Sequence, residues 1–144
     1  MSKRSAIHLI IQFSSLLYLG LKGDLFPNLA MGIPAGLILL FIIWSIITAG
    51  VFNINIQPEV KPQAQLITRG PFSILRHPIY TGLMLYSLFI CIDHSENWDL
   101  WLAFSVLVIN FDLKARYEEK LLLLKFSSYV EYMGNTSRFV PFLY

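Results

Sequence analysis

The strongest constraint on the fold comes from two long stretches of sequence that contain no Asp, Glu, Lys or Arg. They cover residues 6–21 and 29–52, and the second, at 24 residues, exceeds the ~20 residues needed to cross a ~30 Å hydrocarbon core. Two shorter apolar stretches, residues 79–92 and 98–111, flank the polar patch 93–97. This spacing predicts a helical hairpin. The last helix is expected to continue past the bilayer, to about residue 132.

The composition supports a membrane protein. Charged residues make up only 14% of the 144 residues, whereas a soluble domain carries about 25%. The single cysteine, Cys91, excludes an internal disulfide and a cysteine cluster for metal, and the net charge of +2 is too small to indicate nucleic acid. We therefore predict a single all-α integral membrane domain, residues 1–144, with about four transmembrane helices at 6–21, 29–52, 79–92 and 98–132. It should contact membrane lipid and bind neither nucleic acid nor metal.

The positive charges predict the orientation of these helices. With the N-terminus inside, ten of the eleven Lys and Arg residues fall on the cytoplasmic side and only Lys22 falls outside. This asymmetry follows the positive-inside rule. Both termini are therefore expected in the cytoplasm, with the protein in the inner or plasma membrane if it is bacterial.

Polar residues gather in two blocks at the cytoplasmic end, residues 57–82 and 114–141. In the first, His77-Pro78 marks the start of a helix, whose free N–H groups suit an anion flanked by Arg76 and His77. These two residues fit equally well as anchors to lipid headgroups. In the second, Glu118 and Glu119 are adjacent and so point about 100° apart on a helix. We expect one to face inward and the other to be solvated.

A pair of polar residues also lies inside the first apolar stretch. His8 and Gln12 are one helical turn apart. Polar side chains at membrane depth usually find partners on a neighbouring helix. They are therefore expected to form interhelical hydrogen bonds.

The sequence contains no dinucleotide-binding loop, P-loop or zinc-protease motif. The two blocks instead resemble the isoprenylcysteine carboxyl methyltransferase family and its phospholipid methyltransferase relatives. The resemblance covers about residues 57–142. The first block matches the family signature at Leu66, Gly70, Pro71, Phe72, Arg76, His77, Pro78, Tyr80 and Gly82, and the second at Glu118, Glu119, Leu122, Phe126, Tyr129, Tyr132, Arg138, Phe139 and Pro141.

This resemblance implies an integral membrane methyltransferase that uses S-adenosylmethionine, bound by a cytoplasmic loop and the C-terminal helical segment. The residues that it places at the cofactor are Gln57, Gln65, Leu66, Ile67, Phe72, His77, Pro78, Ile79, Tyr80 and Glu118. Glu118 and Arg116 are the catalytic candidates. Lys114 and Arg116 are the candidates on the side of the methyl acceptor, and the sequence does not choose between them.

One departure from the family pattern lies in the second block, where Phe126-Ser127-Ser128-Tyr129 is one residue short and lacks the usual glycine. Two other functions fit the same blocks, an NADPH-dependent enzyme similar to the sterol reductases and a non-catalytic membrane scaffold. The acceptor is also open. A prenylcysteine carboxylate, a phospholipid amine, a small thiol and an isoprenoid-like compound all fit, and the sequence predicts no oligomeric state.

Overall fold

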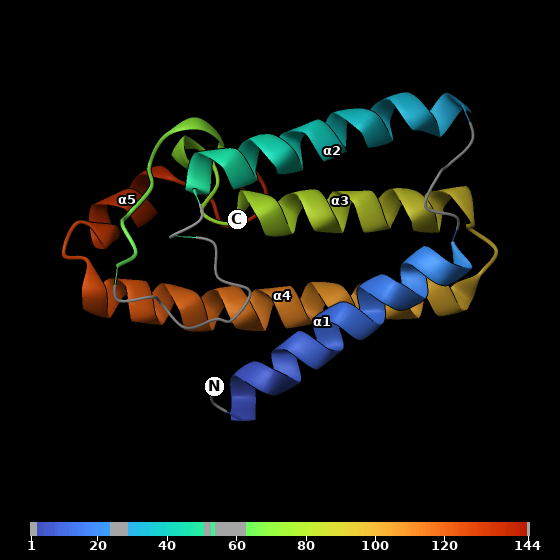
Figure 1. Cartoon of the computed structure of the whole chain (residues 1–144), viewed down its shortest axis with the longest axis horizontal. Helices are drawn as coiled ribbons and strands as arrows, with labels where there is room; N and C mark the ends of the chain where they lie inside the picture. The colour runs from blue at the N-terminus through green and yellow to red at the C-terminus, as the bar shows by residue number, and fades with distance from the viewer. Residues whose placement is uncertain (1–2, 24–28, 51–52, 54–62, 144) are drawn as a thin grey trace.

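The computed structural model describes residues 3–23, 29–50, 53 and 63–143, and within them it is all helical. The helices are α1 (Lys3–Lys22), α2 (Leu29–Ala49), α3 (Pro78–Asp93), α4 (Trp98–Lys125) and α5 (Tyr129–Asn135), with a short 3₁₀ helix, η1 (Gly70–Ser73). Figure 1 shows α2 lying along α3, and α1 crossing the face of α4. Helices α3 and α4 form the predicted hairpin, closed by hydrogen bonds through residues 94–97.

Two glycines with positive φ shape the part of the fold that leads to the polar blocks. Gly50, at φ 72°, follows α2, and its N–H donates to the carbonyl of Ile46. This left-handed residue ends the helix at Ala49, before the predicted residue 52. Gly70, at φ 58°, starts η1 close to Thr48, where a Cβ atom would lie 3.2 Å from that side chain. The chain is thereby turned toward the start of α3.

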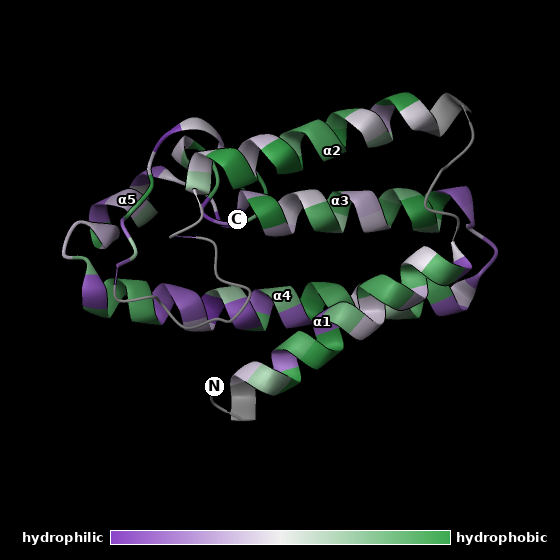
Figure 2. Ribbon diagram, in the orientation of Figure 1, coloured by the Kyte–Doolittle hydropathy of each residue, from purple (hydrophilic) through white to green (hydrophobic). Residues whose placement is uncertain are grey.

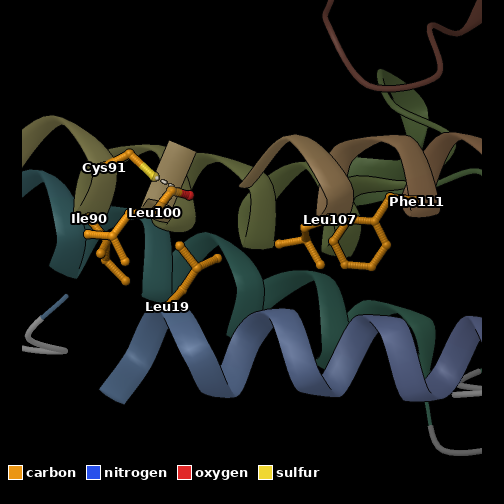
Figure 3. Close-up of a cluster of buried hydrophobic side chains, with 6 residues drawn as sticks. All are labelled: Leu19, Ile90, Cys91, Leu100, Leu107 and Phe111. Atoms are coloured by element: carbon orange, nitrogen blue, oxygen red, sulfur yellow. Dashed lines mark hydrogen bonds between the residues drawn. The ribbon is translucent and has the colours of Figure 1, made fainter. Parts of the chain in front are cut away.

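The hydrophobic core lies between α1, α3 and α4. Its buried members, shown in Figure 3, are Leu19, Ile90, Cys91, Leu100, Leu107 and Phe111. The thiol of Cys91 points at the carbonyl oxygen of Leu100, 3.5 Å away. This packing holds α1 and α3 against the same face of α4.

The outer faces of α1 and α2 are apolar and exposed, as at Ile10, Leu21, Ile33 and Ile47. By length and composition, two stretches are able to cross a membrane, Ser5–Lys22 and Gly32–Ala49, and α3 is a shorter apolar helix. Figure 2 shows α2 as mainly apolar, whereas polar residues gather where α4 approaches α5. The prediction of four crossings goes beyond these two stretches and stays a prediction.

The prediction of one helix from 98 to 132 is wrong. Helix α4 ends at Lys125, Phe126 is extended at φ −122° and ψ 114°, and α5 begins at Tyr129. Serine competes with the helical backbone for hydrogen bonds, and residues 127 and 128 are both serine. The break lets α5 turn back, so that the Tyr132 hydroxyl donates to the carbonyl of Phe72 at 2.7 Å.

Candidate functional site

The polar residues meet around His77, which precedes the first residue of α3. Pro78 follows it at the first helical position, where the missing N–H of proline costs no hydrogen bond. The chain before it is held by the C-terminal segment. Arg76 N–H donates to the carbonyl of Ser137 at 2.8 Å, and Ser137 N–H donates to the carbonyl of Ile74 at 3.0 Å. Backbone hydrogen bonds in both directions therefore fix the chain before α3 to the C-terminal segment.

His77 lies between two carboxylates of α4. Its Nδ1 is 3.6 Å from Glu118 Oε2, and its Nε2 is 3.3 Å from Glu119 Oε1. The exposed fraction is 16% for the Glu118 side chain and 4% for that of Glu119. The expectation that one of the two would be solvated is wrong, because α3, α5 and the C-terminal segment cover this end of α4 on both sides.

Glu119 is held by two guanidinium groups. It accepts a hydrogen bond from Arg76 Nε at 2.8 Å and another from Arg138 Nη2 at 2.7 Å. Burial alone would raise the pKa of Glu119, but the His77 ring and the two guanidinium groups outweigh burial and hold that pKa well below its usual range. Glu119 is therefore a buried anion that joins the start of α3 to the C-terminal segment.

Glu118 has a different environment, although it is the next residue. Its Oε1 accepts a hydrogen bond from the Tyr80 hydroxyl at 2.6 Å. Burial raises the pKa of Glu118, and the nearby positive groups and the Tyr80 hydrogen bond only partly offset it. No guanidinium group is within ion-pairing distance of it among the described residues. Glu118 is thus a carboxylate with capacity left for a cationic or hydroxyl partner.

Stacked aromatic rings form one wall beside these carboxylates. The His77 and Tyr80 rings are nearly parallel with centroids 5.4 Å apart, and the Tyr80 and Phe111 rings are nearly parallel at 4.7 Å. Lys114 Nζ lies 5.0 Å from the Tyr80 ring centroid, within the range of a cation–π interaction. The stack links the carboxylate pair to a buried ammonium group.

One buried atom of this cluster has no hydrogen bond. His77 Nε2 is fully buried and makes no hydrogen bond, although Glu119 Oε1 lies 3.3 Å away, at ion-pairing distance. Buried polar groups are nearly always paired, so an unpaired one needs an explanation. One explanation is a ligand that binds at this end of the bundle, and the charged and aromatic side chains around His77 suit such a ligand.

The structure brings together His77, Pro78, Ile79, Tyr80, Lys114 and Glu118 of the predicted site. It does not bring Arg116 to them, because that side chain is 56% exposed and pairs with Asp112 one turn earlier. Gln65 lies in the loop, its N–H bound to Asn53, while Leu66 and Ile67 are half-buried there and Phe72 is in η1. Gln57 lies outside the described residues.

The structure also adds residues that the sequence did not assign to the site. They are Glu119 with its partner Arg138, and Gln12 of α1, whose Oε1 accepts a hydrogen bond from Lys114 Nζ at 2.9 Å. Arg76, which was expected to flank an anion site, instead pairs with Glu119. Glu119 and the two arginines belong to the same sequence motifs as the predicted residues, which was the available signal. The predicted interhelical bonds of His8 and Gln12 are confirmed, since both residues bond to α4.

The described residues contain no group of three or more His, Cys, Asp or Glu that is placed to hold a metal ion. The described residues combine two helices that are apolar and long enough to span a membrane with a cluster of buried charges near one end of α4. A family model described as phospholipid methyltransferase matches residues 27–128, more than two thirds of the chain, and the chain belongs to that family. No curated protein matches the chain. Membership implies methyltransferase activity toward lipid-related substrates.

Proposed function

We propose that the protein transfers a methyl group from S-adenosylmethionine to a lipidic or small acceptor at the cytoplasmic face of a membrane. The observation that carries this proposal is the cluster of His77, Tyr80 and Glu118, with a buried ring nitrogen that lacks a hydrogen bond. The family match supplies the reaction class. The cofactor and the acceptor are the parts that we add.

The residues of the cluster suit the cofactor chemically. S-adenosylmethionine has an ammonium group, a carboxylate, a sulfonium and an adenosine. Glu118, which has no guanidinium partner in the described part of the chain, suits an ammonium or hydroxyl group, and the start of α3 with His77 suits a carboxylate. Leu66, Ile67 and Phe72 supply apolar surface for the adenine. When bound, the cofactor supplies an electrophilic methyl group.

The chain itself would contribute position and exclusion of water. In-line methyl transfer needs alignment of acceptor, methyl carbon and sulfur more than proton transfer, so holding the groups in place supplies much of the rate. Glu118 and His77 would fix the cofactor. Lys114, buried beside Tyr80, fits the acceptor side better than the exposed Arg116, because its ammonium is already in the cluster.

The decisive experiment is calorimetric titration of the detergent-solubilised protein with S-adenosylhomocysteine, with NADPH as the parallel ligand. We expect S-adenosylhomocysteine alone to bind, and Glu118→Ala and His77→Ala to abolish binding. Glu96→Ala is the matched control, because Glu96 is exposed in the connection at the other end of α4 and should leave binding unchanged. Binding of NADPH alone would favour the reductase function, and binding of neither by folded protein would favour a scaffold.

The acceptor class is tested next with S-adenosylmethionine that carries a tritiated methyl group. N-acetyl-S-farnesylcysteine offers a carboxylate, and vesicles of phosphatidylethanolamine in phosphatidylcholine offer an amine. Base-labile radioactivity in the first identifies a methyl ester. Stable radioactivity in the phospholipid fraction identifies N-methylation.

A further inference from the structure

A pair of hydrogen-bonded contacts joins α1 to the polar half of α4. His8 Nδ1 is 2.7 Å from Asn110 Oδ1, and Asn110 Nδ2 donates to the His8 carbonyl at 3.1 Å. One turn along both helices, Lys114 Nζ donates to Gln12 Oε1 at 2.9 Å. Gln12, Asn110 and Lys114 are all buried. These contacts form a polar seam between the two helices, which a hydrogen bond from the Tyr18 hydroxyl to Asp99 also joins near the start of α4.

The second contact continues directly into the candidate site. Lys114 Nζ lies over the Tyr80 ring, and the Tyr80 hydroxyl donates to Glu118. Lys114 is 1% exposed, and a buried ammonium is costly unless hydrogen bonds hold it. Gln12 offers a neutral amide oxygen, which fixes the ammonium by a hydrogen bond and leaves its positive charge in place.

Gln12 also lies outside the part of the chain that the family model matches, which begins at residue 27. We propose that Gln12 is a positioning residue, which holds the Lys114 ammonium over Tyr80 so that its charge faces the methyl acceptor. The part concerning the acceptor rests on the proposed function. Helix α1 is in this view a component of the site as well as a candidate membrane span.

The first test needs no activity. Lys114 is labelled in the folded protein with formaldehyde and cyanoborohydride, and its dimethylation is followed by mass spectrometry. Gln12→Met keeps the shape but removes the oxygen, and we expect labelling about tenfold faster, the effect of losing a hydrogen bond to a charged group. Gln12→Glu restores an oxygen and should restore protection. Ser14→Ala is the control, because Ser14 is exposed and its hydroxyl bonds to the Ile11 carbonyl of its own helix.

The second test is kinetic and uses whichever of the two acceptors the wild-type protein methylates. We expect Gln12→Met to raise KM for the acceptor about tenfold with kcat nearly unchanged, and with S-adenosylhomocysteine affinity unchanged. Wild-type labelling of Lys114 in Gln12→Met, or wild-type KM, overturns the proposal. An equal fall in kcat and in S-adenosylhomocysteine affinity also overturns it, because that is the signature of a general structural role.

The two proposals fail in different ways. If the wild-type protein binds no S-adenosylhomocysteine and methylates neither acceptor, the proposed function fails. The labelling experiment then still decides whether Gln12 positions Lys114.

Discussion

At the scale of single residues, the adjacent glutamates of α4 have opposite energetic roles. Glu119 is a paired anion, whereas burial disfavours the charge of Glu118. We predict that Glu119→Gln lowers the free energy of unfolding by about 3 kcal/mol, because it leaves Arg76 and Arg138 without their buried partner. Glu118→Gln should leave the free energy of unfolding unchanged or raise it, at the expense of ligand binding. Denaturant titrations of the two variants in detergent measure both effects.

The control for this comparison is Arg116→Ala. The Arg116–Asp112 pair is largely exposed, so its loss should change the free energy of unfolding by less than about 1 kcal/mol. A loss in Arg116→Ala as large as that in Glu119→Gln would contradict the assignment of Glu119 as the buried link.

The pH dependence of stability follows from the same pair. The pKa of Glu119 is lowered on folding, so its stabilisation is complete above the ordinary value of 4.5 and is lost as the pH falls below it. The pKa of Glu118 is raised, so its contribution has the opposite sign and stability is gained as the pH falls toward 4.5. Thermal unfolding from pH 7 to pH 3 should therefore show a smaller acid loss in Glu119→Gln than in the wild type. An unchanged acid loss would contradict this prediction.

At the scale of secondary-structure elements, a side-chain hydrogen bond from Tyr132 to the Phe72 carbonyl joins α5 to η1. We predict that Tyr132→Phe lowers the free energy of unfolding by about 1 kcal/mol, because it leaves that carbonyl unpaired. Val130→Ala is the control in the same helix, since Val130 is 68% exposed. Equal effects of the two substitutions on the unfolding midpoint would show that the hydrogen bond does not hold α5.

The sequence predicted helices more successfully than their ends. Long uncharged stretches allow few alternatives to a helix, so α1, α2 and the α3–α4 hairpin were expected. The break at Phe126 was missed because the apolar run 121–124 suggests a continuing helix. The two serines that follow favour a break only weakly, and the docking of Tyr132 on a distant carbonyl adds to it. The sequence predicted those site residues whose role can be inferred from a single motif, such as His77 and Tyr80. Glu119 was underestimated because its partners come from two other segments, which helical periodicity alone does not bring together.

At the scale of the whole molecule, the two ends of α4 are far apart. Its 28 residues span about 42 Å, more than the ~30 Å of a hydrocarbon core, so the connections at its two ends should lie on opposite sides of the membrane. We predict that a cysteine at Ser95 is labelled by an impermeant maleimide in intact cells, and that one at Ser128 is labelled only after lysis. Cys91 is buried, so the unmodified protein supplies the background. Labelling of Ser128→Cys in intact cells would reverse the predicted orientation.

The seam between α1 and α4 also has a consequence for the order in which the protein is made. Each of its contacts joins residues 102 positions apart. At 5–20 residues per second, His8 and Gln12 are synthesised roughly 5–20 s before their partners. During synthesis, two polar side chains of the first apolar helix therefore wait without the bonds that they make in the finished protein. Assembly of α1 onto α4 is then a late event, because its polar contacts can form only after Asn110 and Lys114 have been synthesised.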